Sequence, residues 1–141
     1  MNKLQVLQNF IGKEFTASPL PFMKWLNPIV VSAEEGKFQF QYTVREEWLN
    51  PMGNLHGGVT AAIIDDVIGA TMFSLNEDSF IVTINNSIDY FSAAKEHDQI
   101  VAETKIIKRG KQFVNAECEI WNTDKSRLIA RGTSNLFKIN S

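Results

Sequence analysis

Residues 50–73, NPMGNLHGGVTAAIIDDVIGATMF, contain the pattern that decides the fold. The stretch opens with Asn50-Pro51-Met52-Gly53, which has the residue types of a type I turn, with Asn first, Pro second and Gly fourth. Apolar residues then recur at helical spacing, which predicts a helix of about four to five turns from near Gly57 to about Ser74. One side of this helix forms a stripe that a sheet would cover, made of Ile63, Ile64, Val67, Ala70 and Thr71.

The opposite side of the predicted helix carries small residues around one carboxylate. Gly58, Ala62, Asp65 and Gly69 fall close to one line at 100° per residue. A glycine inside a helix costs about 1 kcal/mol relative to alanine, so Gly69 needs a compensating reason. Close approach of a second subunit, another backbone or a slender ligand supplies one. Tight packing alone, with Asp65 reaching solvent, is the alternative, and the spacing leaves both open.

The entrance of this helix carries two glycines, Gly57 and Gly58, where the first backbone N–H groups have no helical partner. Glycine allows an oxygen to approach the backbone closely, and the helix dipole favours negative charge there. A carbonyl oxygen that gains negative charge during attack would be stabilised at this point. Asp65 lies roughly 10 Å further along by helix rise. Asp65 therefore cannot attack that same carbonyl carbon within one chain, which predicts a site shared between two subunits.

Strand-like segments flank the central helix on both sides. They are Ile29–Glu34 and Lys37–Val44 before it, and Phe80–Phe91, Gln99–Lys108, Gln112–Trp121 and Arg127–Phe137 after it. The short connections predict antiparallel pairing of consecutive strands. Helical spacing in the first residues predicts an N-terminal helical segment, 1–24, ended by Pro19 and Pro21. The fold class is then α+β, with one sheet and helices on one face, in a single domain over residues 1–141.

Composition excludes several classes of function. Fourteen Lys+Arg against sixteen Asp+Glu give a net charge of −2, so we expect neither a nucleic acid nor a membrane as partner. A lone Cys118 excludes an internal disulfide and a cysteine zinc site, and it falls on the apolar phase of its strand, as a packed thiol would. Without the compact apolar core of a signal peptide, we expect a cytoplasmic location.

Three elements of residues 50–65 together resemble a known family. They are Asn50-Pro51-Met52-Gly53, then His56-Gly57-Gly58, then Asp65 after six intervening residues. This pattern is similar to that of the hotdog-fold acyl-CoA thioesterases, in particular the phenylacetic-acid-degradation (PaaI) type and the small mammalian acyl-CoA thioesterases. The resemblance covers the chain from about Trp25 onward. It implies a long helix wrapped by a curved antiparallel sheet of about six strands, paired into homodimers and usually dimers of dimers, with the active site at the dimer interface.

The resemblance also implies a role for each site residue. Asp65 is the catalytic carboxylate, as general base on water or as direct nucleophile, and Asn50 positions the water or the thioester. The backbone N–H of Gly57 or Gly58 polarises the thioester carbonyl, with His56 at the mouth of the same pocket. Thr83 corresponds to a hydroxyl that helps to hold the nucleophilic water in related enzymes. No cofactor or metal is implied, because coenzyme A is part of the substrate.

Each of these roles has a structural alternative. Asn50 fits its turn well enough to serve only the turn, and His56 could simply fix the loop through a side-chain hydrogen bond. Thr83 lies on the polar phase of its strand, together with Asn85, Ser87 and Asp89. Asp66, about 100° from Asp65, is expected to be a solvated charge or a subunit contact. Desolvation against an acyl chain is expected to raise the pKa of Asp65 and make it a better base.

Cations are the candidate contacts for the coenzyme A phosphates. Lys108, Arg109 and Lys111 surround a tight turn, and Lys95 lies on an earlier connection. The function expected is hydrolysis of a fatty-acyl- or aryl-acyl-CoA thioester. The first alternative is a sensor or carrier that binds acyl-CoA without turnover. The second is an enoyl-CoA hydratase or dehydratase, which the absence of His after Gly57 in the helix disfavours.

Overall fold

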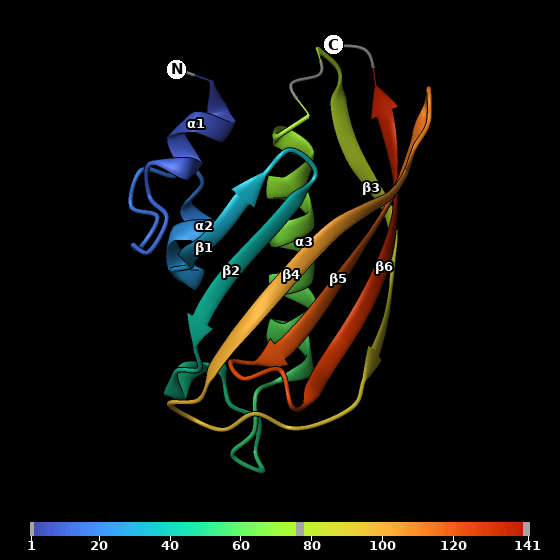
Figure 1. Cartoon of the computed structure of the whole chain (residues 1–141). Coiled ribbons are helices and arrows are strands. Elements are labelled where there is room, and N and C mark those ends of the chain that lie inside the picture. The colour runs from blue at the N-terminus through green and yellow to red at the C-terminus, as the bar shows by residue number, and fades with distance from the viewer. Residues whose placement is uncertain (1, 76–77, 140–141) are drawn as a thin grey trace.

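The computed structural model describes residues 2–75 and 78–139, and its centre is the long helix α3 (Gly57–Phe73), around which a sheet curves (Figure 1). The sheet is antiparallel, with six strands in the order β1-β2-β4-β5-β6-β3. The strands are β1 (Ile29–Glu34), β2 (Lys37–Thr43), β3 (Phe80–Tyr90), β4 (Gln99–Arg109), β5 (Phe113–Asn122) and β6 (Leu128–Ile139). The predicted central helix and all six predicted strands are therefore confirmed, within a few residues at their ends.

The core lies between α3 and the sheet. The predicted apolar stripe of α3 is buried throughout. Side chains of β2, β4, β5 and β6 are also fully buried, among them Phe38, Phe40, Ile100, Ile120 and Leu136. Alternate residues of β5 point inward, and Cys118 is one of them, fully buried, so that burial raises the pKa of its thiol. The prediction of a packed core thiol is thus confirmed.

Strand β3 lies at one edge of the sheet and pairs only with β6 among the described residues. The connection over residues 91–98 does not form a hairpin with β4. It crosses beneath the end of the sheet and delivers the chain to β4, which pairs with β2 and β5 (Figure 1). The prediction that consecutive strands pair is therefore wrong at this point. The placement leaves the outer edge of β3 open beside α3.

The N-terminal segment forms two short helices, not one helix that ends at the prolines. Helix α1 (Lys3–Gln8) begins with a reciprocal cap between Asn2 and Gln5 and stops at Asn9. Helix α2 (Pro21–Leu26) starts at Pro21, which occupies its first turn. The prediction that Pro21 terminates a helix is wrong, because proline is well suited to a first helical position, where its missing N–H has no partner to lose. No helix within the described ranges is long and apolar enough to cross a bilayer.

Candidate active site

The Asp65 carboxylate lies on the exposed side of α3, beside β3. Its Oδ1 accepts hydrogen bonds from Thr83 Oγ1 at 3.4 Å and from Asn86 Nδ2 at 3.1 Å. Asn86 is itself fixed, because Ser134 Oγ on β6 donates to Asn86 Oδ1. The carboxylate is thus held by β3 in one orientation while it stays open to solvent in the single chain.

A β-bulge explains why Thr83 and Asn86 both reach this carboxylate. Residues three apart in a regular strand point to opposite faces, but the register of β3 shifts between Thr83 and Asn85. Thr83 and Asn86 lie opposite Leu136 and Ser134, which are both buried beneath α3, whereas Asn85 lies opposite the exposed Asn135. The grouping of Thr83 with Asn85 in one phase is therefore wrong. Asn86 was missed for the same reason, since strict alternation gives no sign of a bulge.

The first turn of α3 presents one free backbone amide. His56 is the N-cap, and its Nδ1 accepts the Gly58 N–H at 2.8 Å. That contact requires an unprotonated Nδ1, so neutral His56 carries its proton on Nε2. The Gly57 N–H has no acceptor among the described residues, while Tyr90 Oη donates to the Gly57 carbonyl at 3.1 Å. Of the two predicted amide donors, Gly57 is the one left available to a ligand.

Asn50 builds the turn that precedes the helix. Its Oδ1 accepts the N–H groups of Met52 at 2.9 Å and Asn54 at 3.0 Å, and its carbonyl accepts the Gly53 N–H at 2.9 Å. The predicted turn is confirmed, with Gly53 in the left-handed region at φ 80°. Asn50 and Gly57 nevertheless line the same cavity of about 300 Å³, between this turn, Tyr90 and residues 91–94. The Asn50 amide nitrogen, unlike its oxygen, has no partner in the described part of the chain.

Asp66, the neighbour of Asp65, points the other way. Its Oδ2 is buried without a hydrogen-bond partner among the described atoms. Burial, and then the charge of Asp65, raise the pKa of Asp66 from 3.8 to about 6. The fully buried Tyr42 of β2 lies near enough for the charge of Asp66, after burial, to raise the pKa of its phenol. The expectation of a fully solvated charge is therefore wrong, whereas the alternative, a subunit contact, stays a prediction.

The candidate cations fall into two groups at opposite ends of β4. Lys95 precedes β4, whereas Lys108 and Lys111 line a hollow at the β4–β5 turn. Arg109 lies beside them, with Nη1 3.4 Å from Glu35 and Nη2 donating to the Leu75 carbonyl at 3.2 Å. An eleven-residue strand separates the two groups by roughly 33 Å, so one chain does not bring them together. Across residues 2–75 and 78–139, no three His, Cys, Asp or Glu side chains gather as metal ligands would.

The sequence profile of the thioesterase superfamily matches residues 52–129, which include the helix entrance, Asp65, Thr83 and Asn86. Human acyl-coenzyme A thioesterase 13 is 32% identical over 103 residues, which are 73% of this chain and 74% of that protein. The chain belongs to the thioesterase superfamily. It is accordingly a thioester hydrolase, and Asp65 lies inside the region that the superfamily profile matches.

Solved structures agree with this placement. A hypothetical thioesterase protein from Streptococcus pneumoniae, crystallised with coenzyme A, is 25% identical with a TM-score of 0.75, covering 82% of this chain and 88% of that one. Escherichia coli PaaI, from the phenylacetic acid degradation operon, is 19% identical with a TM-score of 0.83, covering 99% and 98%. At that identity PaaI shows the fold alone. The fold is the hotdog arrangement that the sequence resemblance implies.

Proposed function

We propose that this thioesterase hydrolyses fatty-acyl- or aryl-acyl-CoA to the free acid and coenzyme A, at a site that two copies of the chain complete together. The observation that carries the proposal is the Asp65 carboxylate, held by Thr83 and Asn86 on the open face of α3. The names of the relatives, which include an acyl-coenzyme A thioesterase and a hypothetical thioesterase protein crystallised with coenzyme A, support this substrate class.

The open edge of β3 offers the surface for a second copy. This edge strand exposes large apolar side chains, including Phe80, Val82, Ile84 and Tyr90. An exposed apolar edge strand is a template for pairing with another chain, and a two-fold axis would pair β3 with its own copy. The small residues of α3 beside it allow close approach. Gly57 and Asp65, two turns apart within one helix, then come from different copies.

The proposed reaction uses groups from both copies. Asp65 accepts a proton from water, and the water oxygen attacks the thioester carbon. The Gly57 N–H of the second copy stabilises the developing oxyanion, assisted by the helix dipole. The C–S bond then breaks, the leaving coenzyme A thiolate takes the proton from Asp65, which restores the carboxylate, and the acid is released. Direct attack by Asp65, through an anhydride that water hydrolyses, uses the same residues.

The cations fit the same assembly. The β4–β5 turn lies at the end of the sheet where β3 begins, because Phe80 pairs with Ile139 and Phe113 with Phe137. Lys95 follows the other end of β3. Antiparallel pairing of β3 with its copy places Lys108 and Lys111 of one chain at the same end as Lys95 of the other. We propose that these lysines, with Arg109 beside them, meet the coenzyme A phosphates.

Mixing two inactive variants tests the shared site. Asp65→Asn removes the carboxylate, and Gly57→Pro removes the free N–H at the first helical position, where proline is tolerated. The His56 backbone, at φ −65° and ψ 134°, already suits a residue before proline. Each variant alone is expected to be inactive. Half of the randomly mixed dimers are heterodimers with one intact site of two, so co-expression is expected to restore about a quarter of wild-type thiol release.

Gly57→Ala is the matched control for the proline variant. An added Cβ there lies 3.5 Å from the Tyr90 ring, an ordinary contact, and the N–H is retained. We expect Gly57→Ala to keep most of the activity. No recovery on mixing, from variants shown to exchange subunits, would contradict a shared site. Full activity of Asp65→Asn would remove the carboxylate from the mechanism.

A further inference from the structure

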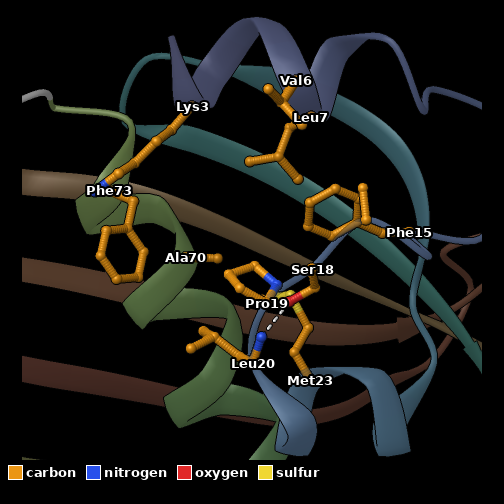
Figure 2. Close-up of a pocket in the computed structure, with 11 residues that line it drawn as sticks. Lys3, Val6, Leu7, Phe15, Ser18, Pro19, Leu20, Met23, Ala70 and Phe73 are labelled. Atoms are coloured by element: carbon orange, nitrogen blue, oxygen red, sulfur yellow. Dashed lines mark hydrogen bonds between the residues drawn. The ribbon is translucent and has the colours of Figure 1, made fainter.

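An apolar cavity of about 300 Å³ lies beyond the candidate site, between α1, residues 15–23 and the C-terminal half of α3 (Figure 2). Ala70 and Phe73 of α3 form one wall. Val6 and Leu7 of α1, Phe15, and Pro19, Leu20 and Met23 form the others. Its volume is at the small end of the roughly 300–1,000 Å³ range of ligand pockets, so it suits part of a ligand better than a whole one.

The lining offers almost no polar group to an occupant. Ser18 is buried, and its oxygen accepts the Leu20 N–H at 3.2 Å. Lys3 reaches across the rim from α1, with its ammonium 4.5 Å from the centre of the Phe73 ring (Figure 2). An occupant with polar atoms would lose hydrogen bonds to water there without replacing them. A plain hydrocarbon segment would not.

A second hollow lies beside this cavity, on the side of α3 that carries Gly69. Gly69, one turn beyond Asp65 on the same side of α3, lines this hollow of about 490 Å³ with Met72 and Ile81. A Cβ added at Gly69 would meet no atom of the described residues within 4 Å, so these residues leave space open along the helix. Lys3 and Phe73 line both this hollow and the cavity, so the two spaces are adjacent and these side chains form the wall between them.

We propose that the cavity receives the far end of a straight, unsubstituted acyl chain, which runs from Asp65 along Gly69 and past the Lys3–Phe73 wall. This inference rests on the proposed function and narrows its substrate to straight-chain acyl thioesters long enough to pass that wall. The rise of α3 puts Ala70 about 7.5 Å and Phe73 about 12 Å beyond Asp65. A butanoyl chain is too short to cover that path, whereas a dodecanoyl chain covers it.

Two non-hydrolysable ligands, S-butyl-CoA and S-dodecyl-CoA, test the cavity by equilibrium titration without any need for turnover. Hydrolysis of butanoyl-CoA and dodecanoyl-CoA is measured in parallel. Each methylene buried in the cavity is expected to tighten binding about fourfold, which corresponds to about 0.8 kcal/mol. Ala70→Leu fills one wall and Val6→Phe the opposite wall. Both variants are expected to lose affinity for the dodecyl ligand by at least about tenfold and to keep their affinity for the butyl ligand.

Controls separate a filled cavity from a damaged fold. Ala70 is buried, so Ala70→Leu can disturb α3, whereas Val6 is half-buried on α1 and provides the second variant. Val31→Phe makes the same exchange as Val6→Phe at an exposed position of β1 outside the cavity, and it is expected to change neither affinity.

The outcomes distinguish this inference from the proposed function. Active variants whose chain-length dependence matches the wild type would overturn the cavity and leave acyl-CoA hydrolysis standing. Equal wild-type affinity for the two ligands would overturn it as well. A wild-type protein that hydrolyses neither of these thioesters nor an aryl-acyl-CoA, yet binds the dodecyl ligand in a way that both cavity variants abolish, would overturn the proposed function and support the cavity.

Discussion

Asp65 and Asp66 are adjacent, identical residues on α3, and the helix turns them into opposite environments. Asp65 faces the open edge strand and accepts two hydrogen bonds from β3. Asp66, about 100° around the helix, has a buried oxygen without a partner and a pKa raised to about 6. The difference shows that position on the helix, not residue type, sets the role of each carboxylate. Asp65 is accessible to a substrate, whereas burial of Asp66 is expected to lower the free energy of unfolding.

The largest difference between the two carboxylates is expected in turnover. Asp65→Asn should lower kcat by about 10²–10⁴-fold, the typical loss when a positioned general base is removed. Asp66→Asn should leave thiol release within a few-fold of wild type, because that side chain points away from the exposed face. The measurement is thiol release from dodecanoyl-CoA with both variants at matched purity. An equal loss of kcat in Asp65→Asn and Asp66→Asn would contradict the different roles assigned to the two carboxylates.

The next largest effect is expected from the loss of a hydrogen bond to Asp65. Asn86→Ala removes one of its two donors, and a hydrogen bond to a charged group is worth about 1.5–3 kcal/mol. We expect kcat to fall about 10–100-fold with KM little changed. Asn85→Ala, one residue away on the outer face of the bulged strand, is the control and should be near wild type. If Asn85→Ala and Asn86→Ala behave alike, the bulge does not set which residue supports Asp65.

The two carboxylates are also expected to differ in their effect on stability, because only Asp66 should make the free energy of unfolding depend on pH between about 4 and 6. Folding raises the pKa of Asp66 from 3.8 to about 6, through burial and then the charge of Asp65. The folded state therefore binds more protons between these values, and stability falls as pH rises from about 4 to about 6. Asp66→Asn should remove that decline and raise the free energy of unfolding at pH 7 by about 1–3 kcal/mol.

Urea unfolding at several pH values, at one protein concentration, checks this expectation. Asp65→Asn supplies the comparison, because it keeps the decline that Asp66 causes. An Asp66→Asn variant with an unchanged pH profile would show that Asp66 is not desolvated in the folded protein.

The smallest effect concerns the influence of one carboxylate on the other. The charge of Asp65 contributes to the raised pKa of Asp66, after desolvation. Asp65→Asn should therefore lower the pKa of Asp66, by less than burial raises it. The pH-dependent decline in stability should then occur at slightly lower pH. Titration of the Asp66 carboxyl by NMR in wild type and Asp65→Asn measures this directly. An upward shift would contradict the assigned cause.

The sequence predicted the main elements well and the local exceptions poorly. Periodicity located α3 and all six strands, since helical and alternating patterns report which face is buried. It did not detect the bulge in β3, so Asn86 was missed. It also misjudged Pro21, because a proline that ends one helix and one that begins another look alike in sequence. Asp66 could not be assigned, because its burial depends on what packs across from it.

The site itself was predicted only as far as backbone and spacing allow. The two-turn separation of Gly57 and Asp65 is a property of any helix, so it could be derived in advance. The sequence could not show whether the N–H of Gly57 or that of Gly58 stays free, because this depends on the orientation of the His56 ring. The N–H of Gly58 is bonded to His56, so among the described residues the Gly57 N–H is the one without an acceptor, and we propose it as the donor.

The N-terminal helices have an evolutionary consequence. Residues 3–23, which provide most of the cavity wall, lie before the region from 52 to 129 that the superfamily profile covers. If this cavity sets chain-length preference, mutations there can retune which fats or acids the enzyme accepts while the reactive centre is inherited unchanged. A change of substrate preference would then need substitutions only in residues 3–23, far along the chain from Asp65.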